Sequence, residues 1–371
     1  MYVRRPPKIV DLFAGPGGLD VAARWLDVPT VGIELDKSAC ETRDAEKLDT
    51  RNDDVRAFEP SDFRDATVLA GGPPCQTYTV AGTGVGRRAL EEVLDFADRM
   101  ALRKNVASDL EQLAADHDGD DRTGLVLEPL RWALQAIDDD NPYDAIVLEQ
   151  VPAVLPVWQA MKTILEKEGY KADCGVLRAE EFGVPQTRRR AVLIARLDGE
   201  AVLPEPTHQA YHKNAPRHGG DAKLLPWVAM EDVLDRPEPY IVVSNYGTGG
   251  DPKNRGQRSS SEPAFTVTGK ISRNRVWLLD GRPADPPRFT VREAGMLQTF
   301  PPDYQWRGRD VAQQIGNAIP PRLAAHILAA ALGYEKEVLH KIFPDLGAPV
   351  GEPMELLRSR AADSGVSGTT T

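Results

Sequence analysis

Short apolar segments, each leading into a glycine or an acidic residue, recur along the first half of the chain and constrain its fold more than any other feature. They are Lys8–Phe13, Thr30–Glu34, Val68–Ala70 and Tyr143–Leu148. Each is short enough for a buried strand, and stretches with helical spacing lie between them. Strands that alternate with helices are typical of an α/β protein with a doubly wound, mostly parallel sheet, which binds ligands at the carboxyl ends of its strands.

A glycine-rich turn, Ala14–Gly18, connects the first apolar segment to a short predicted helix, Leu19–Leu26. Glycine lets the backbone approach a ligand closely, although a turn with a purely structural role has the same composition. The dinucleotide-binding pattern G-x-G-x-x-G is not met, because its third glycine would fall on Asp20. Glu34 ends the second segment, where a carboxylate can hydrogen-bond to ribose hydroxyl groups. Together the turn and the acid predict a site for a nucleoside cofactor, without identifying it.

Two residues at predicted strand ends are candidates for catalysis. Cys75 follows two glycines and two prolines directly after Val68–Ala70, and a free thiol at that place is a candidate nucleophile. The alternative is a small buried residue, the usual role of a free cysteine. Glu149 follows Tyr143–Leu148 and is either a catalytic group or an exposed acid at the start of a loop.

Three adjacent arginines precede another apolar segment, Ala191–Ala195. Clustered arginines usually form a solvated or phosphate-facing surface. Because alternate residues of a strand point to opposite sides, Arg188 and Arg190 should share one side with Gln186. We expect that side to face the same cleft as Glu149.

The net charge of the whole chain does not indicate nucleic-acid binding, but the charge of one segment does. The chain has 371 residues, a net charge of −11 and an apolar fraction of 41%, which suffices for a sizeable core. The segment Ser244–Arg282 instead carries seven basic and three acidic residues. Its serine and asparagine side chains suit phosphates and base edges, although a polar loop region without a partner is the alternative. A local basic surface of this kind predicts contact with nucleic acid.

Changes in composition along the chain predict its domains. We expect a catalytic and cofactor-binding domain over residues 1–203, with a surface helical insertion at about 87–121 whose charged face is solvated. The alternation of strands and helices then stops, and residues 204–285 are expected to form a second, smaller domain. Residues 286–345 return to the first domain, and residues 346–371 form a flexible tail.

The cysteines indicate a reduced protein. Cys40, Cys75 and Cys174 are too few and too scattered for a disulfide framework or a zinc site. The sequence has no apolar run of membrane-spanning length and no signal peptide. We therefore expect a cytoplasmic monomer without a metal and without membrane attachment.

Six segments resemble, in the family's order, the motifs of the DNA cytosine-5 methyltransferases of bacterial or phage type. The similarity covers roughly residues 8–333. The segments are Asp11–Gly18, Gly72–Gln76, Glu149–Val151, Gln186–Arg190, Arg288–Pro301 and Gly316–Pro321. One such segment would be a modest signal, but six in order are specific. The resemblance implies a Rossmann-like methyltransferase sheet with a target-recognition domain at residues 204–285.

The resemblance also implies a reaction and a site. A methyl group would pass from S-adenosylmethionine to carbon 5 of a flipped-out cytosine in a specific DNA sequence, leaving S-adenosylhomocysteine. Cys75 would add to carbon 6, Glu149 would neutralise the ring at nitrogen 3, and Arg190 would hold the ring's carbonyl oxygen. Arg188 would hold the catalytic loop or a backbone phosphate. The cofactor site would comprise Phe13, Ala14, Gly15, Gly17, Gly18, Glu34, Leu35, Asp54, Val55, Pro74, Leu125, Asn317 and Ala318.

Two residues depart from the family's pattern. Gln150 stands where relatives usually have Asn, and Leu35 stands where relatives often carry an aromatic residue that stacks on adenine. We expect Gln150 to affect the rate more than the reaction. Double-stranded DNA is the expected partner, and a cognate restriction endonuclease is a candidate one. The alternatives are a tRNA cytosine-5 methyltransferase, disfavoured by the large region 204–285, and a non-catalytic DNA-binding relative, disfavoured by the intact Cys75, Glu149, Arg188 and Arg190.

Overall fold

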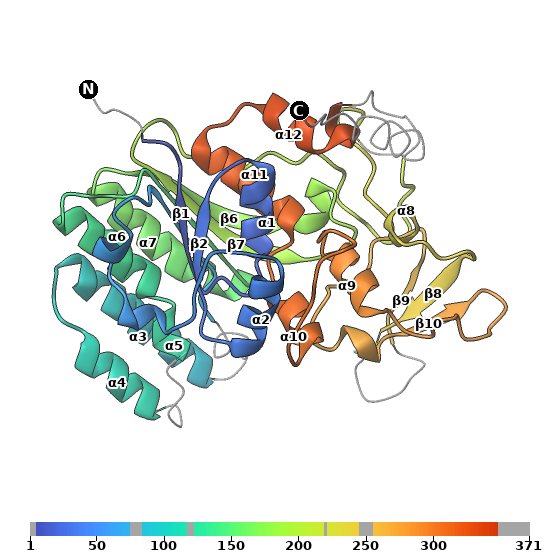
Figure 1. The fold of residues 1–371 in the computed structure, drawn as a ribbon, viewed down its shortest axis with the longest axis horizontal. Helices are drawn as coiled ribbons and strands as arrows, with labels where there is room; N and C mark the ends of the chain where they lie inside the picture. The colour runs from blue at the N-terminus through green and yellow to red at the C-terminus, as the bar shows by residue number, and fades with distance from the viewer. Residues whose placement is uncertain (1–4, 75–83, 117–121, 219–220, 245–254, 348–371) are drawn as a thin grey trace, which may run out of the picture.

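The computed structural model describes residues 5–74, 84–116, 122–218, 221–244 and 255–347, which form a larger and a smaller lobe (Figure 1). A seven-stranded sheet with the order β3-β2-β1-β4-β5-β7-β6 lies at the centre of the larger lobe. Its strands are β1 (Ile9–Leu12), β2 (Thr30–Ile33), β3 (Thr50–Arg51), β4 (Val68–Gly71), β5 (Ala145–Gln150), β6 (Lys171–Arg178) and β7 (Arg189–Arg196). The first five strands pair in parallel, whereas β7 is antiparallel to both β5 and β6. The predicted doubly wound, mostly parallel sheet is thus confirmed.

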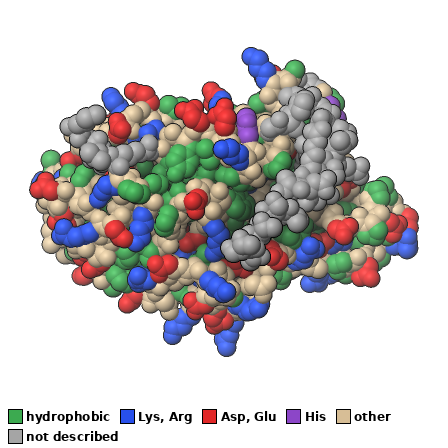
Figure 2. All heavy atoms as spheres, turned by 45° about the horizontal axis from the view of Figure 1, so that its top comes forward, with side chains coloured by type: hydrophobic (Ala, Val, Ile, Leu, Met, Phe, Trp, Pro, Cys, Tyr) green, Lys and Arg blue, Asp and Glu red, His purple; other side chains and the backbone are tan. Residues whose placement is uncertain are grey.

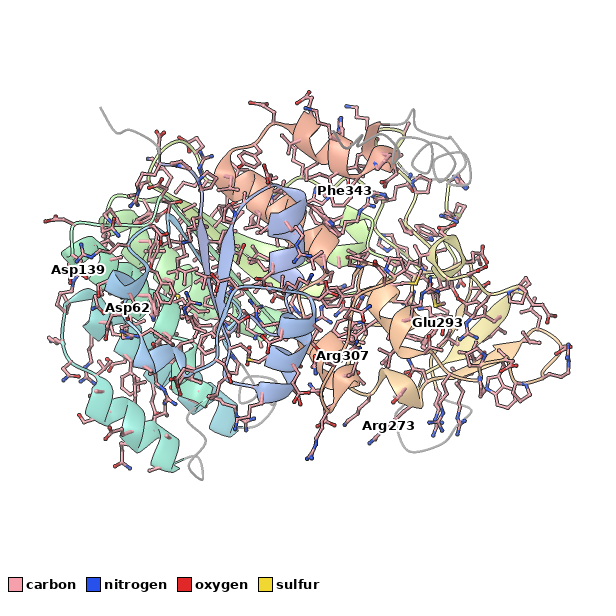
Figure 3. The ribbon with its side chains drawn as sticks, in the orientation of Figure 1. Asp62, Asp139, Arg273, Glu293, Arg307 and Phe343 are labelled. Carbon is pink, nitrogen blue, oxygen red and sulfur yellow. The ribbon has the colours of Figure 1, made fainter. Side chains whose placement is uncertain are left out.

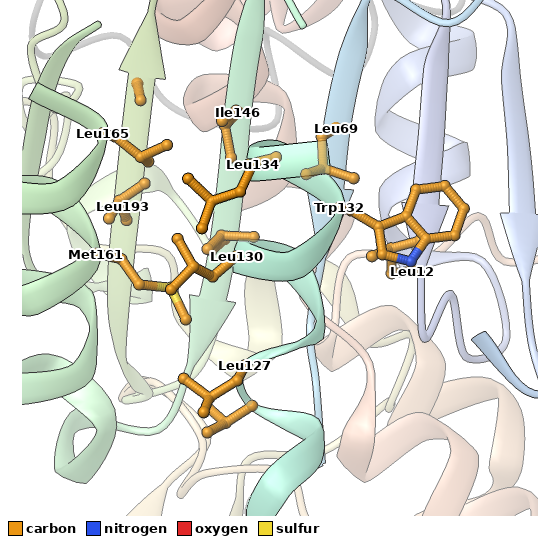
Figure 4. Packing of buried hydrophobic residues seen from close by; sticks show 14 of the residues in the cluster. Leu12, Leu69, Leu127, Leu130, Trp132, Leu134, Ile146, Met161, Leu165 and Leu193 are labelled. Carbon is orange, nitrogen blue, oxygen red and sulfur yellow. The ribbon is translucent and has the colours of Figure 1, made fainter. Parts of the chain in front are cut away.

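Helices cover both faces of this sheet. On one face lie α3 (Gly84–Ala101), α6 (Glu128–Asp138) and α7 (Leu155–Lys167), and Figure 4 shows Leu130, Trp132 and Met161 packed between these helices and the strands. On the other face α1 (Gly18–Trp25) packs against α11 (Pro321–Leu332) in a second core cluster. Trp132 and Trp158 are fully buried, so large aromatic side chains anchor the first core.

The predicted surface insertion is only partly at the surface. Ala89, Val93, Phe96 and Ala97 of α3 are buried in the core beside α6 and α7. Their spacing places all four on one face of the helix, which packs on the sheet layer instead of projecting from it. The following helix, α4 (Ala107–Asp116), buries Leu113. The insertion therefore packs on the larger lobe through the apolar face of α3, whereas Glu91, Glu92 and Asp95 on its charged face are exposed, as predicted.

The smaller lobe contains a three-stranded antiparallel sheet with the order β10-β8-β9. Its strands are β8 (Tyr240–Val243), β9 (Gln257–Ser259) and β10 (Arg275–Leu278), with the short helix α8 (Met230–Val233) beside them. Its core continues beyond residue 285 into α9 (Val291–Leu297) and α10 (Val311–Asn317), through Ala294, Leu297 and Ile315. These two helices therefore join the lobes, and the boundary at residue 285 stays a prediction.

The last described segment is fastened to the larger lobe by a buried cluster. It comprises α12 (Lys336–Ile342) and the 3₁₀ turn Pro344–Gly347. Asp345 forms an ion pair with Arg322, and its carboxylate lies 3.4 Å from Nε2 of His208. The ring of His326 stacks on Phe343, which Figure 3 places beside the end of α12.

The surface mixes charges of both signs. On the face shown in Figure 2, basic and acidic side chains are interspersed around a group of hydrophobic side chains. Within the described ranges, no helix is both long and apolar enough to cross a membrane.

Candidate active site

A cavity of about 1050 Å³ opens at the carboxyl edge of the large sheet, next to the ends of β1, β2, β4 and β5. The sheet order places β1 beside β4, where the chain switches from one half of the sheet to the other, and α/β sheets bind ligands at such points. Glu149 and Arg190 line this cavity. So do these residues predicted to hold the cofactor: Phe13, Ala14, Gly15, Gly18, Glu34, Leu35, Asp54, Val55, Pro74, Leu125, Asn317 and Ala318.

The glycine-rich turn folds tightly at the cavity's edge. Its backbone has positive φ angles at Phe13, Gly15 and Gly17. Gly17 caps α1 with φ of 101°, and a Cβ atom there would lie 2.4 Å from Cδ1 of Leu48. Gly17 was predicted to contact the cofactor, but it is not among the described residues that line the cavity. Residue 17 must be glycine because of the positive φ angle and the close approach of Leu48 in this turn.

The carboxylate of Glu34 organises that turn. Its two oxygens accept hydrogen bonds from the backbone N–H groups of Gly15 and Asp36, each at 2.7 Å. Burial raises the pKa of Glu34, and these two hydrogen bonds oppose the rise. Each oxygen keeps a second lone pair, so the predicted contact with ribose hydroxyls stays open to it. Leu35 beside it is 61% exposed at the cavity wall, where it presents an aliphatic surface.

A buried ion pair supports the turn from below. Asp20, the residue that breaks the dinucleotide-binding pattern, accepts two hydrogen bonds from Arg43 at 2.8 and 3.0 Å. Both side chains are almost fully buried, and Arg43 also donates to Thr50 Oγ1 at 2.9 Å. A Cβ atom on Gly32 would lie 2.1 Å from the Arg43 guanidinium. The departure at Asp20 thus has a structural cause that the sequence pattern did not reveal.

Glu149 and Arg190 form an ion pair inside the cavity. Glu149 Oε1 lies 2.5 Å from Arg190 Nε, and both side chains are largely buried. Glu149 belongs to the end of β5 and Arg190 to the start of β7, and the antiparallel pairing of these strands brings the two ends together. Burial lowers the pKa of Arg190, while the adjacent Glu149 opposes that change. The predicted proximity of these two residues is confirmed.

Gln150 connects the end of β5 to the loop that leads to the candidate nucleophile. Its Nε2 donates to the carbonyl oxygen of Pro73 at 2.7 Å, and its Oε1 accepts from the backbone N–H of Val151 at 2.5 Å. Pro74 lines the cavity, so this loop reaches the site. Cys75 itself lies outside the described residues.

Arg188 occupies a different place from the one predicted. It is 1% exposed, it is absent from the described lining of the cavity, and its guanidinium donates to the carbonyl oxygens of Val267, Gly316 and Ala318. Strand β7 begins at Arg189, so residue 188 precedes the strand and the alternation rule does not apply to it. The expectation that Arg188 faces the cleft with Arg190 was wrong.

The sequence analysis missed several polar residues at the cavity. Asp11 lines it and is 4% exposed, and burial, together with the nearby Asp20, raises its pKa well above the usual range. Its only signal was an acid inside an apolar segment. Arg309 and Gln313 line the opposite wall from α10 and its N-terminal approach. Asn317, predicted on a turn, is the last residue of α10.

Comparison with known proteins gives the same family for most of the chain. A family model described as C-5 cytosine-specific DNA methylase matches residues 7–95, 130–222 and 235–332. The chain is 30% identical to the type II methyltransferase M1.HphI of Haemophilus parahaemolyticus, over 87% of this chain and 86% of that protein. It is 27% identical to the type II methyltransferase M.Sau96I of Staphylococcus aureus, over 88% of this chain and 76% of that protein.

Solved structures share the fold. The S. pombe Dnmt2 methyltransferase aligns with a TM-score of 0.57 at 15% identity, over 88% of this chain and 98% of that one. The Entamoeba histolytica methyltransferase EhMeth aligns with a TM-score of 0.55 at 13% identity, over 89% and 99%. At such low identity these likenesses concern the architecture alone.

Proposed function

The chain belongs to the C-5 cytosine-specific DNA methylases, a family of DNA cytosine-5-methyltransferases, and we propose that it methylates a flipped-out cytosine within a specific DNA sequence through a covalent Cys75 adduct. The observation that carries this proposal is the Glu149–Arg190 pair in the same cavity as the glycine-rich turn and Glu34. The groups that we propose to hold the base and the cofactor therefore line one cavity.

The cavity suits S-adenosylmethionine, which would supply an electrophilic methyl group. A Cβ atom on Gly18 would lie 2.3 Å from the carbonyl oxygen of Ile319, so glycine keeps this wall thin. Glu34 offers acceptor lone pairs for ribose hydroxyls, and the buried Asp11 offers a carboxyl group to a cationic ligand. Phe13, Val55 and Leu125 supply apolar surface for the rest of the cofactor.

The chain's own residues would activate the base. The Cys75 thiolate would add to carbon 6 of cytosine, which makes carbon 5 nucleophilic enough to accept the methyl group. Glu149 would hold nitrogen 3 and the amino group, and Arg190 would hold the carbonyl oxygen as charge develops on the ring. Loss of the carbon-5 proton and of the thiolate would restore the aromatic ring. A paired base cannot enter this buried site, so the proposal includes base flipping.

Exposed cations near the cavity support DNA as the substrate. Lys270, Arg273 and Arg275 are exposed on the smaller lobe, and Arg309 is exposed at the cavity mouth. Figure 3 shows Arg273 and Arg307 on the lower side of the junction between the lobes. We infer that DNA phosphates lie across this junction and that residues 204–285 read the target sequence. The names of the type II relatives also support a restriction endonuclease as a cognate partner.

Bisulfite sequencing of DNA from cells that express the chain tests the proposal. We expect one short sequence to be methylated, and exchange of residues 204–285 with those of a relative should change that sequence. Cys75→Ala should abolish methylation, whereas the control Cys174→Ala, in the outer strand β6, should not. Duplexes with 5-fluorocytosine should trap a covalent complex with the wild type only, because fluorine cannot leave as a proton does. An active Cys75→Ala variant, or no trapped complex, would refute the covalent route.

A further inference from the structure

Three buried polar side chains join the smaller lobe to the wall of the cavity. They are Gln186, Arg188 and Gln298, which are at most 1% exposed, and we call them the internal brace. Gln186 and Arg188 precede β7, and Gln298 follows α9. Gln186 Nε2 donates to Gln298 Oε1 at 2.7 Å, and Arg188 is connected to these two side chains through the backbone of Val267 and Ala318.

One end of the brace holds the backbone of Val267 in the smaller lobe. Gln186 Oε1 accepts from the N–H of Val267, and Arg188 donates to its carbonyl oxygen, both at 2.9 Å. Both backbone groups of this fully buried residue are therefore fixed. Three residues later the chain reaches Lys270, and then Arg273 and Arg275, the exposed cations near the cavity. The brace therefore holds the segment that leads into these three exposed basic residues.

The other end holds the cavity wall. Arg188 donates to the carbonyl oxygens of Gly316 and Ala318, and Gln298 donates to those of Ile315 and Ala318. Gly316 and Ala318 line the cavity. The two ends also touch directly, because a Cβ atom on Gly316 would lie 2.3 Å from the backbone nitrogen of Gly269. A shift of either segment must therefore displace the other.

Burial of the charged Arg188 side chain at this connection costs the protein stability. Within the described chain no carboxylate forms an ion pair with its guanidinium, and its Nε has no hydrogen-bond partner. Burial without a counter-ion costs stability, and apolar residues often stabilise such positions as well or better. The seven hydrogen bonds of the brace described above are specific, in contrast, because each one fixes the position of a backbone or amide group.

We propose that the internal brace couples DNA binding by the smaller lobe to cofactor binding in the cavity, with Arg188 as a positioning residue that touches neither ligand. This rests on the proposed function and goes beyond it. Linkage requires that the effect be reciprocal: the cofactor product should tighten binding of the target duplex by the same factor by which the duplex tightens binding of the product. We expect a factor on the order of tenfold in the wild type.

Calorimetric titrations measure this factor. S-adenosylhomocysteine is titrated with and without a duplex that contains the sequence identified by bisulfite sequencing. Arg188→Lys keeps the charge but loses the planar fork, and Gln298→Met keeps the length but loses the amide. Both variants should bind each ligand alone within about threefold of the wild type, with the coupling factor reduced to about one. Gln298→Met, the milder change, carries the test if Arg188→Lys does not fold.

The matched control is Arg236→Lys. Arg236 is a partly buried arginine whose side chain is 5% exposed, but it pairs with Glu293 and with the carbonyls of Pro286 and Arg288, away from the cavity wall. This variant should lose stability and retain the coupling factor. A coupling factor of one in the wild type, or an unchanged factor in folded Arg188→Lys and Gln298→Met, would overturn the proposal and leave the brace a structural contact. Failure of the proposed function is distinct, because then no sequence is methylated at all.

Discussion

Gln150→Asn tests whether the Gln150 amide positions the loop before Cys75. Gln150 Nε2 lies 2.7 Å from the carbonyl oxygen of Pro73, while strand pairing with β7 fixes the Gln150 backbone opposite Ala191. Asn is one methylene shorter, about 1.5 Å of reach. With the backbone held, its amide would stop about 4 Å from the Pro73 oxygen, too far for a hydrogen bond. The substitution therefore removes the hydrogen bond to Pro73 and displaces the oxygen that accepts from the Val151 N–H, while the functional group stays an amide.

The expected loss of rate follows mainly from the hydrogen bond between Gln150 and Pro73. A net hydrogen bond contributes about 0.5–1.5 kcal/mol. Pro73 is buried, so a carbonyl left without a partner there brings the loss to the upper end of this range. Misplacement of the attacking group adds to the loss, because proximity effects are steep. We expect the methyl-transfer step to slow by about tenfold, which corresponds to about 1.4 kcal/mol.

Single-turnover rates on the target duplex, with saturating cofactor, isolate this step from product release. Gln159→Asn, an exposed position on α7, is the matched control and should leave the rate unchanged. Melting temperatures of both variants should stay near that of the wild type. An equal or faster rate for Gln150→Asn would refute the reasoning, because Gln150 would then mark a weakened site and not an accommodated one.

Two further predictions concern buried titratable groups. Burial lowers the pKa of His326 to about 3, so between pH 7 and pH 5 the unfolded chain gains a proton that the folded chain excludes, and stability falls as the pH falls. This loss should be about 2 kcal/mol, and denaturant titrations should find it removed in His326→Phe; an equal loss in that variant would assign it to other groups. Burial raises the pKa of Asp11, and a cationic ligand should lower it again, so S-adenosylmethionine binding should release protons. Calorimetry in buffers of different ionisation enthalpy should find less release with S-adenosylhomocysteine and with Asp11→Asn, and unchanged release in the variant would exclude Asp11 as the source.

The features predicted best from the sequence were the buried strands and the residues at their ends, because the whole of each short segment lies in the same apolar environment. Apolar runs placed five of the seven strands of the large sheet within a residue or two, and the strand ends placed Glu34 and Glu149 at the cavity. Local patterns are reliable there because a buried parallel strand must be apolar on both faces. The polar residue that follows such a strand then has only the ligand-binding edge to occupy.

The sequence predicted least well what depends on the partner of a side chain. Periodicity assigned Arg188 to the cleft, because nothing local marks that β7 starts one residue later. Asp20 breaks the dinucleotide-binding pattern, and the sequence gives no sign that it forms a buried ion pair with Arg43. The depth to which α3 is buried depends in the same way on α6 and α7, which supply the apolar surface that it covers. In each case the decisive neighbour lies far along the chain.

The two buried arginines suggest why the walls of the cavity need such distant partners. Arg43 holds the wall formed by the glycine-rich turn, through Asp20 and the carbonyl of Asp49. Arg188 holds the opposite wall through Gly316 and Ala318. Both walls contain glycine, and their backbone carbonyl groups cannot be satisfied by apolar contacts. A guanidinium fork can satisfy several carbonyls or carboxylate oxygens from one buried point. The same feature that lets backbone approach a ligand closely therefore calls for a cation behind it, and the cation must come from a segment the local sequence does not reveal.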